Sequence, residues 1–213
     1  MTFDLGVASF DPLDDRVLLW TRLHGGGAAE WEVARDPGFA DVVATGDART
    51  ADAPWTITVD ATGLEPGTTY WYRFTAGGER SQVGRTRTLP APATARLRIA
   101  VVCCARFSQA TFAVYRAVAA ADVDLVVHLG DYVYEDHKDG VPGREYDPPH
   151  DALSLADYRA RYEQHRGDED LQLVHAAHPM IALWDDHDIA DNAWRDGAKA
   201  HDERRQGRWA DRV

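Results

Sequence analysis

Two short acidic segments carry the side chains that could do chemistry. Asp131 and Tyr134 stand in Gly-Asp-Tyr-Val-Tyr directly after an apolar run, and Asp185–Asp188 (Asp-Asp-His-Asp) follows a second apolar run. Cys104 comes soon after a third run. Thiolate, carboxylate, phenolate and imidazole groups are ligands that metals accept in mixed sets. The residue types therefore predict a mixed-ligand metal site, provided that the three runs end at one place.

The three apolar runs have the composition of strands in one parallel sheet. They cover Leu97–Val102, Val123–Leu129 and Pro179–Leu183, and the pattern of Leu97–Val102 is that of a buried strand. Helical spacing separates them, over Gln109–Ala121 and again over 154–177. This alternation favours a three-stranded parallel sheet with right-handed crossovers. Because ligands gather beyond the carboxyl ends of such strands, we expect the chemical groups to meet there.

Local signals mark where the later helices begin. Ser154 and Asp157 form the pattern of a capping box, which opens a long helix. Acids at Asp168–Asp170 favour a second helix start, over Leu171–Ala177, because a helix N-terminus attracts negative charge. The intervening Asp136–Asp151 is rich in Gly, Pro and acids and is expected to be a loop.

Plainer interpretations exist for the same residues. Gly130 and Asp131 could form an ordinary turn on which Tyr134 packs, and Asp185–Asp188 could be a solvated acidic loop. Three aspartates within four residues repel one another unless cations or solvent intervene. Arg106 could contact a phosphate or be a surface or salt-bridged residue, and a buried, hydrogen-bonded role is expected for His128 inside its strand.

The first ninety residues have a different pattern. Short β-branched and aromatic runs alternate with Gly and Pro turns, which is typical of a small antiparallel sandwich. The expected strands are Arg16–Leu23, Glu30–Ala34, Thr56–Asp60 and Tyr70–Ala76. Leu89–Ala93, with two prolines, is expected to be a stiff linker, which divides the chain into domains at 1–90 and 91–213.

Composition excludes some functions. The 213 residues carry a formal net charge of −12, which argues against nucleic acid held by a basic patch. The negative charge does not exclude phosphate substrates, since bound metal cations reverse the sign of the local electrostatic field. The two cysteines are adjacent and cannot build a disulfide framework. The sequence contains no apolar run typical of a transmembrane segment or a signal peptide.

Several spaced motifs resemble the PhoD-type (alkaline phosphatase D) family of metallophosphoesterases. The motifs, in chain order, are GVASFDP, VLLWTRL, LEPGTTYWYRF, HLGDYVYE, LADYRARYEQHRGDEDLQLVHAAHP and WDDHDIADNAW. The resemblance implies an all-β, fibronectin type III-like sandwich followed by an α/β calcineurin-like metallophosphatase domain. It also implies hydrolysis of small phosphate mono- and diesters with iron (Fe³⁺) and calcium (Ca²⁺), by hydroxide from a metal-bound water. Because family members often carry an export signal, the resemblance suggests a secreted or periplasmic location, which this sequence does not itself indicate.

The resemblance also implies roles for individual residues. Cys104, Asp131 and Tyr134 match metal ligands, and Asp131 matches the carboxylate that bridges two metals. Asp186 matches a ligand that faces the second metal, and His187 matches the catalytic histidine beside the scissile phosphate. Two positions are less direct: Cys103 replaces a serine of the family pattern, and the ligand role of Asn192 is left open.

The resemblance covers only the first half of the family's catalytic domain. After Asn192 the remaining sequence is polar, helix-like and without strands, so we expect a truncated α/β domain whose sheet lacks a covering layer. An incomplete ligand set predicts weak metal binding and little activity from this chain alone. Two hypotheses follow: a metal-dependent phosphoesterase, or a non-catalytic β-module with a vestigial phosphatase appendage that acts in binding or structure. Oligomeric state is not predicted.

Overall fold

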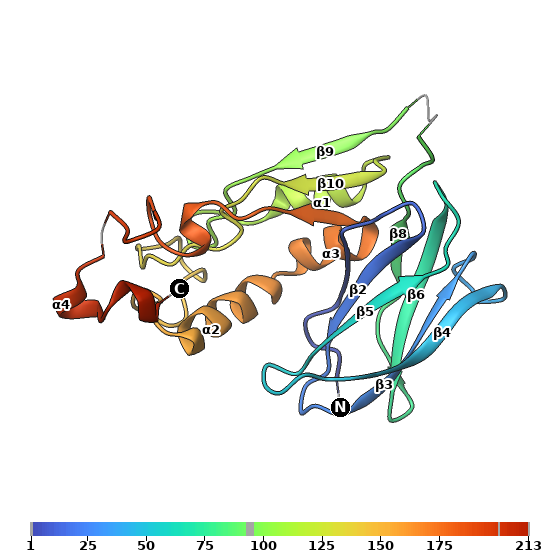
Figure 1. The fold of residues 1–213 in the computed structure, drawn as a ribbon, viewed down its shortest axis with the longest axis horizontal. Helices are drawn as coiled ribbons and strands as arrows, with labels where there is room; N and C mark the ends of the chain where they lie inside the picture. The colour runs from blue at the N-terminus through green and yellow to red at the C-terminus, as the bar shows by residue number, and fades with distance from the viewer. Residues whose placement is uncertain (1, 93–95, 200, 213) are drawn as a thin grey trace. The chain divides into compact units, whose positions relative to one another are not determined.

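The computed structural model describes residues 2–92, 96–199 and 201–212 (Figure 1). The strands, in chain order, are β1 (Val7–Phe10), β2 (Arg16–Arg22), β3 (Ala28–Ala34), β4 (Val42–Arg49), β5 (Thr56–Thr62), β6 (Thr69–Ala76), β7 (Glu79–Arg80), β8 (Gly84–Arg87), β9 (Ile99–Val102), β10 (Leu125–His128) and β11 (Met180–Ala182). The α-helices are α1 (Ala113–Ala119), α2 (Leu155–Arg166), α3 (Glu169–Ala177) and α4 (Glu203–Gln206), and the 3₁₀ helices are η1 (Asp186–Asp188) and η2 (Trp209–Asp211).

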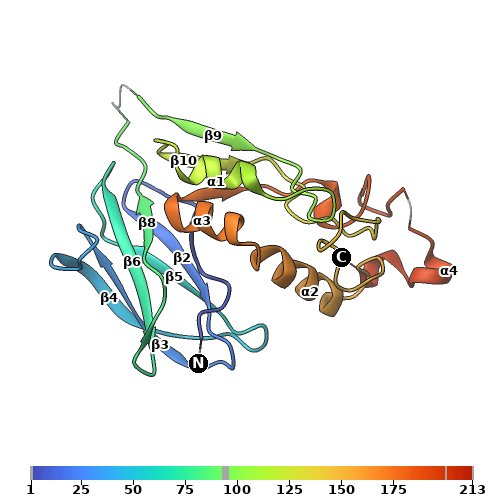
Figure 2. The same ribbon diagram turned by 180° about the vertical axis from the view of Figure 1, so that it is seen from behind.

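The first ninety residues form the predicted β-sandwich. One sheet has the order β4-β3-β6-β7, with β8 also paired to β6 (Figure 2), and β5-β2-β1 belongs to the other sheet. Leu19, Ile57 and Phe74 are completely buried in the core of this unit. Alternate residues of β5 and β6 are buried, as expected for strands with one face on a core.

The four strands predicted for the sandwich are present, and four further strands are found there. The expectation missed β1, β4, β7 and β8, which are short or weakly apolar. In β4, Gly46 interrupts the pattern, but the glycine is required because a Cβ there would lie 2.9 Å from the indole of Trp31. From the sequence pattern, a strand glycine that makes room for a neighbouring ring cannot be distinguished from a glycine that forms a turn.

The three predicted parallel strands are present as β9, β10 and β11, but they extend a sheet of the sandwich, so the sheet has six strands and not the expected three. The order is β5-β2-β1-β11-β10-β9, and β1 pairs in parallel with β11 through Phe10 and Met180. Strands β9 and β10 also run parallel, because the backbone hydrogen bonds from Asp124 to Arg98 and from Leu129 to Val102 advance in the same direction along both. One edge of the sheet is thus the end strand β9.

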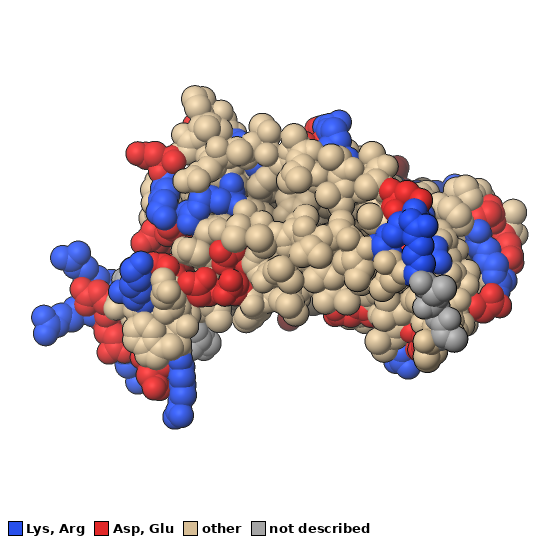
Figure 3. Space-filling model, turned by 90° about the horizontal axis from the view of Figure 1, so that it is seen from above, with Lys and Arg blue, Asp and Glu red and all other residues tan. Residues whose placement is uncertain are grey.

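Strand β9 is more exposed than its sequence predicts. Ile99 and Val101 are 45% and 61% exposed, whereas Leu125 and Val126 of β10 are buried. An apolar strand is exposed when it lies at the edge of a sheet and no layer covers its outward side chains. Figure 3 shows a face with a broad stretch that carries neither acidic nor basic side chains. The expectation of a buried strand over Leu97–Val102 is therefore wrong.

The helix starts follow the local signals closely. Ser154 caps α2, and the capping box with Asp157 is present as predicted. Helix α3 begins at Glu169, inside the predicted acidic start. Helix α1 is shorter than the predicted Gln109–Ala121 and begins only at Ala113, after a turn over 107–110.

The described chain clusters into two compact units. One comprises residues 1–100, 114–127 and 169–181, and the other comprises 101–113, 128–168 and 182–213. The predicted linker Leu89–Ala93 ends at a residue outside the described ones. The sequence-based division at residue 90 stays a prediction of domain organisation. Among the described residues, no helix is long and apolar enough to cross a lipid bilayer.

Candidate metal centre

The residues predicted to do chemistry follow the ends of three neighbouring strands. Cys104 comes two residues after β9, and Asp131 comes three residues after β10. Asp186 opens η1, shortly after β11. The strand ends are held in register by hydrogen bonds of 2.9 Å, from the backbone N–H of Leu129 to the carbonyl of Val102 and from that of Leu183 to the carbonyl of His128.

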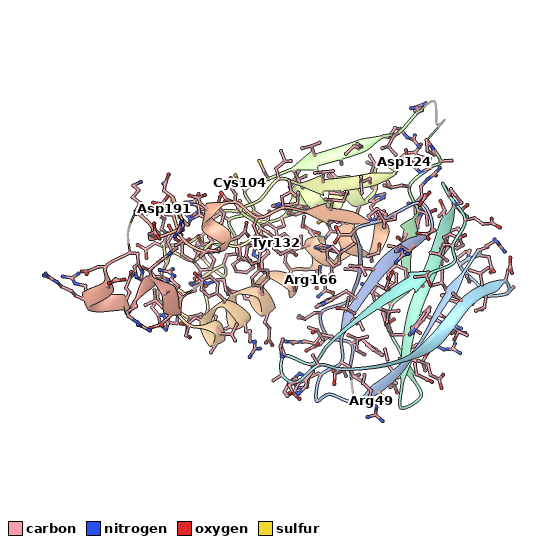
Figure 4. The ribbon with its side chains drawn as sticks, viewed as in Figure 1. Arg49, Cys104, Asp124, Tyr132, Arg166 and Asp191 are labelled. Carbon is pink, nitrogen blue, oxygen red and sulfur yellow. The ribbon has the colours of Figure 1, made fainter. Side chains whose placement is uncertain are left out.

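Asp131 lies at the middle of the cluster. Its Oδ2 accepts a hydrogen bond from the Tyr134 hydroxyl at 2.9 Å and a weaker one from the Cys104 thiol at 3.6 Å. Asp131 and Tyr134 are buried, and Cys104 is exposed to solvent. Figure 4 labels Cys104 among the side chains that follow β9. A thiol, a phenol and a carboxylate thus converge on a single oxygen atom.

The backbone around these residues takes conformations that favour a tight turn. Cys104 and Asp131 have φ angles of 60° and 53°, which are uncommon for residues with a side chain. Gly130, at φ 114°, passes so close to Asp185 that a Cβ would lie 2.5 Å from the Asp185 Cβ. Backbone hydrogen bonds from Cys104 to Gly130 and from Ala105 to Asp131 join the two loops. Such outliers cluster at functional sites, where the surrounding structure holds them in place.

Asp186 and His187 complete the cluster from the η1 side. One ligand atom each from Asp131, Asp186 and His187 lies within 4.8 Å of the others. The backbone N–H of His187 also donates to Oδ1 of Asp131, at 3.3 Å. The five residues expected to act together, Cys104, Asp131, Tyr134, Asp186 and His187, are therefore neighbours in the structure.

Asp188 relieves the repulsion expected within the acidic run. This carboxylate is buried and turns inward, where it accepts the backbone N–H groups of Asp131, Tyr132, Val133 and Asp185. Asp185 is exposed to solvent. Backbone donors and water therefore separate these charges, whereas the sequence alone led us to expect only cations and solvent in this role.

Glu135 is a member of the cluster that the sequence pattern did not reveal. Its side chain is buried, and Oε2 lies 2.8 Å from Nδ1 of His187. The ring of Tyr134 packs against this histidine, with ring centroids 4.4 Å apart. Glu135 directly follows Tyr134 in the motif, and this adjacency is the one sequence feature that points to it. The spacing itself does not distinguish a buried glutamate from a solvated one.

Burial and hydrogen bonding set the protonation of the sulfur and oxygen donors in the protein alone. Burial, together with the hydrogen bond to Asp131, raises the pKa of the Tyr134 phenol. Partial desolvation, with Cys103 and Asp131 alongside, raises the pKa of the Cys104 thiol. Burial also raises the pKa of Asp188, despite its backbone donors. Without a cation, the thiol and the phenol therefore keep their protons.

Three residues that the sequence left open or assigned a plain role are resolved by their contacts. Arg106 pairs with Asp136, and its guanidinium lies over the ring of Tyr134, 3.7 Å from the centroid, so the salt-bridge alternative is the one observed. Asn192 is exposed and its backbone N–H donates to a carboxylate oxygen of Asp186. His128 is fully buried, and its Nδ1 accepts the backbone N–H of Gly130, as expected.

The donor set fits a metal ion. The hydrogen atoms of Cys104 and Tyr134 both point at Asp131 Oδ2, and a cation would replace those two protons at the same place. Once deprotonated, the sulfur and the phenolic oxygen would be anionic donors beside a carboxylate. The cluster thus has the composition of a mixed-ligand site for a highly charged metal.

The described residues thus contain an antiparallel sandwich and parallel strands, and an acidic cluster follows the carboxyl ends of the parallel strands. Sequence comparison finds the PhoD-like phosphatase family at residues 99–213 and the PhoD-like phosphatase N-terminal domain at residues 1–90. The chain belongs to the PhoD-like phosphatase family.

Two individual relatives give the extent of the likeness. Alkaline phosphatase D of Bacillus subtilis (strain 168) is 38% identical over 208 residues, which cover 89% of this chain and 36% of that protein. A solved structure described as the structure of PhoD matches with a TM-score of 0.87 at 37% identity, and the match covers 94% of this chain and 42% of that one. The chain thus spans about a third of the length of the curated relative.

Proposed function

We propose that this chain carries a metal centre of a phosphate ester hydrolase. Cys104, Asp131, Tyr134 and Asp186 are the metal ligands, and His187 is the catalytic residue. The observation that carries the proposal is the convergence of a thiol and a phenol on one oxygen of Asp131, at 3.6 and 2.9 Å. Membership of the PhoD-like phosphatase family supports phosphate ester hydrolysis as the reaction class. Because the chain spans only about a third of the length of its curated relative, its own activity and substrates are proposals.

The donor types suggest iron and calcium as the two metals. A thiolate and a phenolate donate strongly as anions and suit Fe³⁺, whereas carboxylate oxygens such as those of Asp186 suit Ca²⁺. Asp131 would be shared between the two ions. When bound, the cations neutralise charge on phosphate oxygens and lower the pKa of a coordinated water. This chain's own part is to hold the sulfur and oxygen donors in a tight turn.

His187 has the role of proton donor. Its imidazolium can protonate the leaving oxygen of the ester or stabilise the charge that develops there. The side chain comes from the same 3₁₀ helix as Asp186, so substrate held near that carboxylate is within reach of the imidazole. The acidic net charge of −12 is compatible with phosphate substrates because metal cations reverse the field locally.

The finer features of the family are also part of the proposal. We expect small phosphate mono- or diesters as substrates and a secreted or periplasmic location. We also expect the sandwich to be of the fibronectin type III-like kind. These expectations come from the family resemblance. We do not expect a nucleic-acid partner held by a basic patch.

Metal uptake and ester hydrolysis test the proposal together. The metal-free chain is dialysed to equilibrium against Fe³⁺ and Ca²⁺, analysed for metal in excess of the dialysis buffer, and assayed in the same buffer for hydrolysis of p-nitrophenyl phosphate and its bis-ester. We expect bound metal that is lost in Asp131→Asn and kept in Asp196→Asn, an exposed carboxylate of the same unit. In His187→Ala metal should stay while any turnover falls about 100-fold. A chain that takes up no metal and hydrolyses neither ester supports the non-catalytic β-module instead.

A further inference from the structure

Glu135 is a buried carboxylate to which the metal proposal gives no role. Only 5% of the residue is exposed, and its Oε2 lies 2.8 Å from Nδ1 of His187. A carboxylate only accepts hydrogen bonds, so the Nδ1 atom must carry a proton for this pair to form. We propose that Glu135 is the positioning residue that fixes His187 in the Nδ1–H tautomer and presents Nε2 to the substrate. The inference rests on the catalytic role proposed for His187.

The second oxygen of Glu135 keeps the carboxylate from turning away. Oε1 accepts the backbone N–H of Asp191 at 2.6 Å, and the backbone carbonyl of Glu135 accepts the N–H of Ala152 at 2.8 Å. Both oxygens thus have a donor, as a buried carboxylate requires. The backbone amide of Asp191 fixes the position of Oε1, and this in turn fixes the position of Oε2 beside His187.

Two further contacts position His187, one through its ring and one through its backbone. The ring of Tyr134 lies 4.4 Å away between centroids, with an interplanar angle of 37°, and the backbone N–H of His187 donates to Asp131 Oδ1. On the far side of the ring, Nε2 lies 4.0 Å from a carboxylate oxygen of Asp191, which is too far for a hydrogen bond. Turning the ring over about its Cβ–Cγ bond would place Cδ2 where Nδ1 lies and would break the hydrogen bond to Glu135.

Fixing the tautomer matters for proton donation. With Nδ1–H bound to a carboxylate, any proton that His187 gains or gives up is carried by Nε2, on the side away from Glu135. The carboxylate also stabilises the imidazolium, as the buried aspartate does for the histidine of serine protease triads. To act as the donor, His187 takes up a proton from water at Nε2 and delivers it from the same atom to the leaving oxygen. In the opposite neutral tautomer Nε2 already carries its proton and cannot take one up.

Nuclear magnetic resonance of the ring nitrogens tests the proposal on the 213-residue chain without metal or substrate. The ¹⁵N-labelled chain is studied at alkaline pH, and His187→Gln assigns the signals. We expect a protonated Nδ1 and an unprotonated Nε2 in the wild type. In Glu135→Gln, the glutamine carbonyl must accept the N–H of Asp191, so its NH₂ group faces Nδ1 and the proton should move to Nε2.

Two further variants separate positioning from a structural role. Glu135→Asp keeps an acceptor and should retain the Nδ1–H form, and Glu30→Gln makes the same chemical change on the exposed face of β3 and should alter nothing at His187. A wild-type chain with Nε2–H, or an unchanged tautomer in Glu135→Gln, overturns the inference. The wild-type spectrum decides even if a variant does not fold. The tautomer is measured without metal or substrate. It can therefore be confirmed or refuted separately from the proposed hydrolase function.

Discussion

Asp188 binds the backbone of Asp131, with its Oδ2 2.8 Å from the amide nitrogen. The same carboxylate accepts the N–H groups of Tyr132 and Val133 at 3.0 and 3.2 Å and that of Asp185 at 2.9 Å. One buried side chain therefore ties the loop after β10 to the turn after β11. The distance between the ligands on these two loops is set by the protein before any metal binds.

Replacing Asp188 with asparagine should destabilise this junction. An amide has a single acceptor oxygen, and its NH₂ group would face backbone donors that need an acceptor. We expect Asp188→Asn to lower the free energy of unfolding by about 2 to 4 kcal/mol, measured by urea denaturation. Asp196→Asn, whose side chain is exposed, should change it by less than about 0.5 kcal/mol. Equal midpoints for the two variants would contradict this role.

Gly130 should not tolerate a side chain. It has φ 114°, and an added Cβ would lie 2.5 Å from the Cβ and 2.6 Å from the backbone nitrogen of Asp185. We expect Gly130→Ala to cost about 2 kcal/mol or more and to weaken metal uptake, because the loop that carries Asp131 must move. Gly143→Ala is the matched control, since φ is 82° there and nothing lies within 4 Å. If both variants lose the same stability, the close approach is not what matters.

His128 should make stability depend on pH. Burial lowers its pKa from 6.5 to about 4, and its Nδ1 accepts the N–H of Gly130, so the folded form is neutral. Between these pH values the unfolded chain binds more protons, and stability that is fully present above pH 6.5 is lost as the pH falls to about 4.

The size of this effect follows from the shift. We expect a loss of up to about 3 kcal/mol across that window, measured by denaturation at a series of pH values. His128→Gln has no titrating ring, so its free energy of unfolding should change less with pH over the same window, even if the variant is less stable at neutral pH. Parallel curves for the wild type and His128→Gln would exclude His128 as the source.

Local sequence signals predicted the elements that bear the site. The capping box at Ser154 and the apolar runs before Asp131 and Asp186 are local features, and the structure contains the corresponding helix and strands. What failed depends on distant contacts. The pairing of Phe10 with Met180, which extends the sandwich sheet, and the exposure of Val101 at its edge cannot be read from either segment alone.

The same distinction holds within the candidate site. Residue types placed Cys104, Asp131 and Tyr134 in one hypothesis, because thiol, carboxylate and phenol side chains are unusual together. Glu135 and Asp188 were missed as individual partners, since carboxylates in an acidic segment look alike until the structure shows which of them are buried. Their importance comes from backbone and imidazole donors that no sequence spacing identifies.

A visible absorption measurement tests the central claim most directly. A phenolate and a thiolate bound to Fe³⁺ each give a charge-transfer band, so titrating the metal-free chain with Fe³⁺ should produce absorption that Tyr134→Phe weakens and that the double variant Cys104→Ala/Tyr134→Phe abolishes. Tyr146→Phe is the control, because that hydroxyl is buried and has no hydrogen-bond partner among the described residues. We expect the same absorption in the wild type and in Tyr146→Phe, a weaker and shifted band in Tyr134→Phe, and none in the double variant. An unchanged band in Tyr134→Phe, or no band in the wild type, would contradict the proposed metal centre.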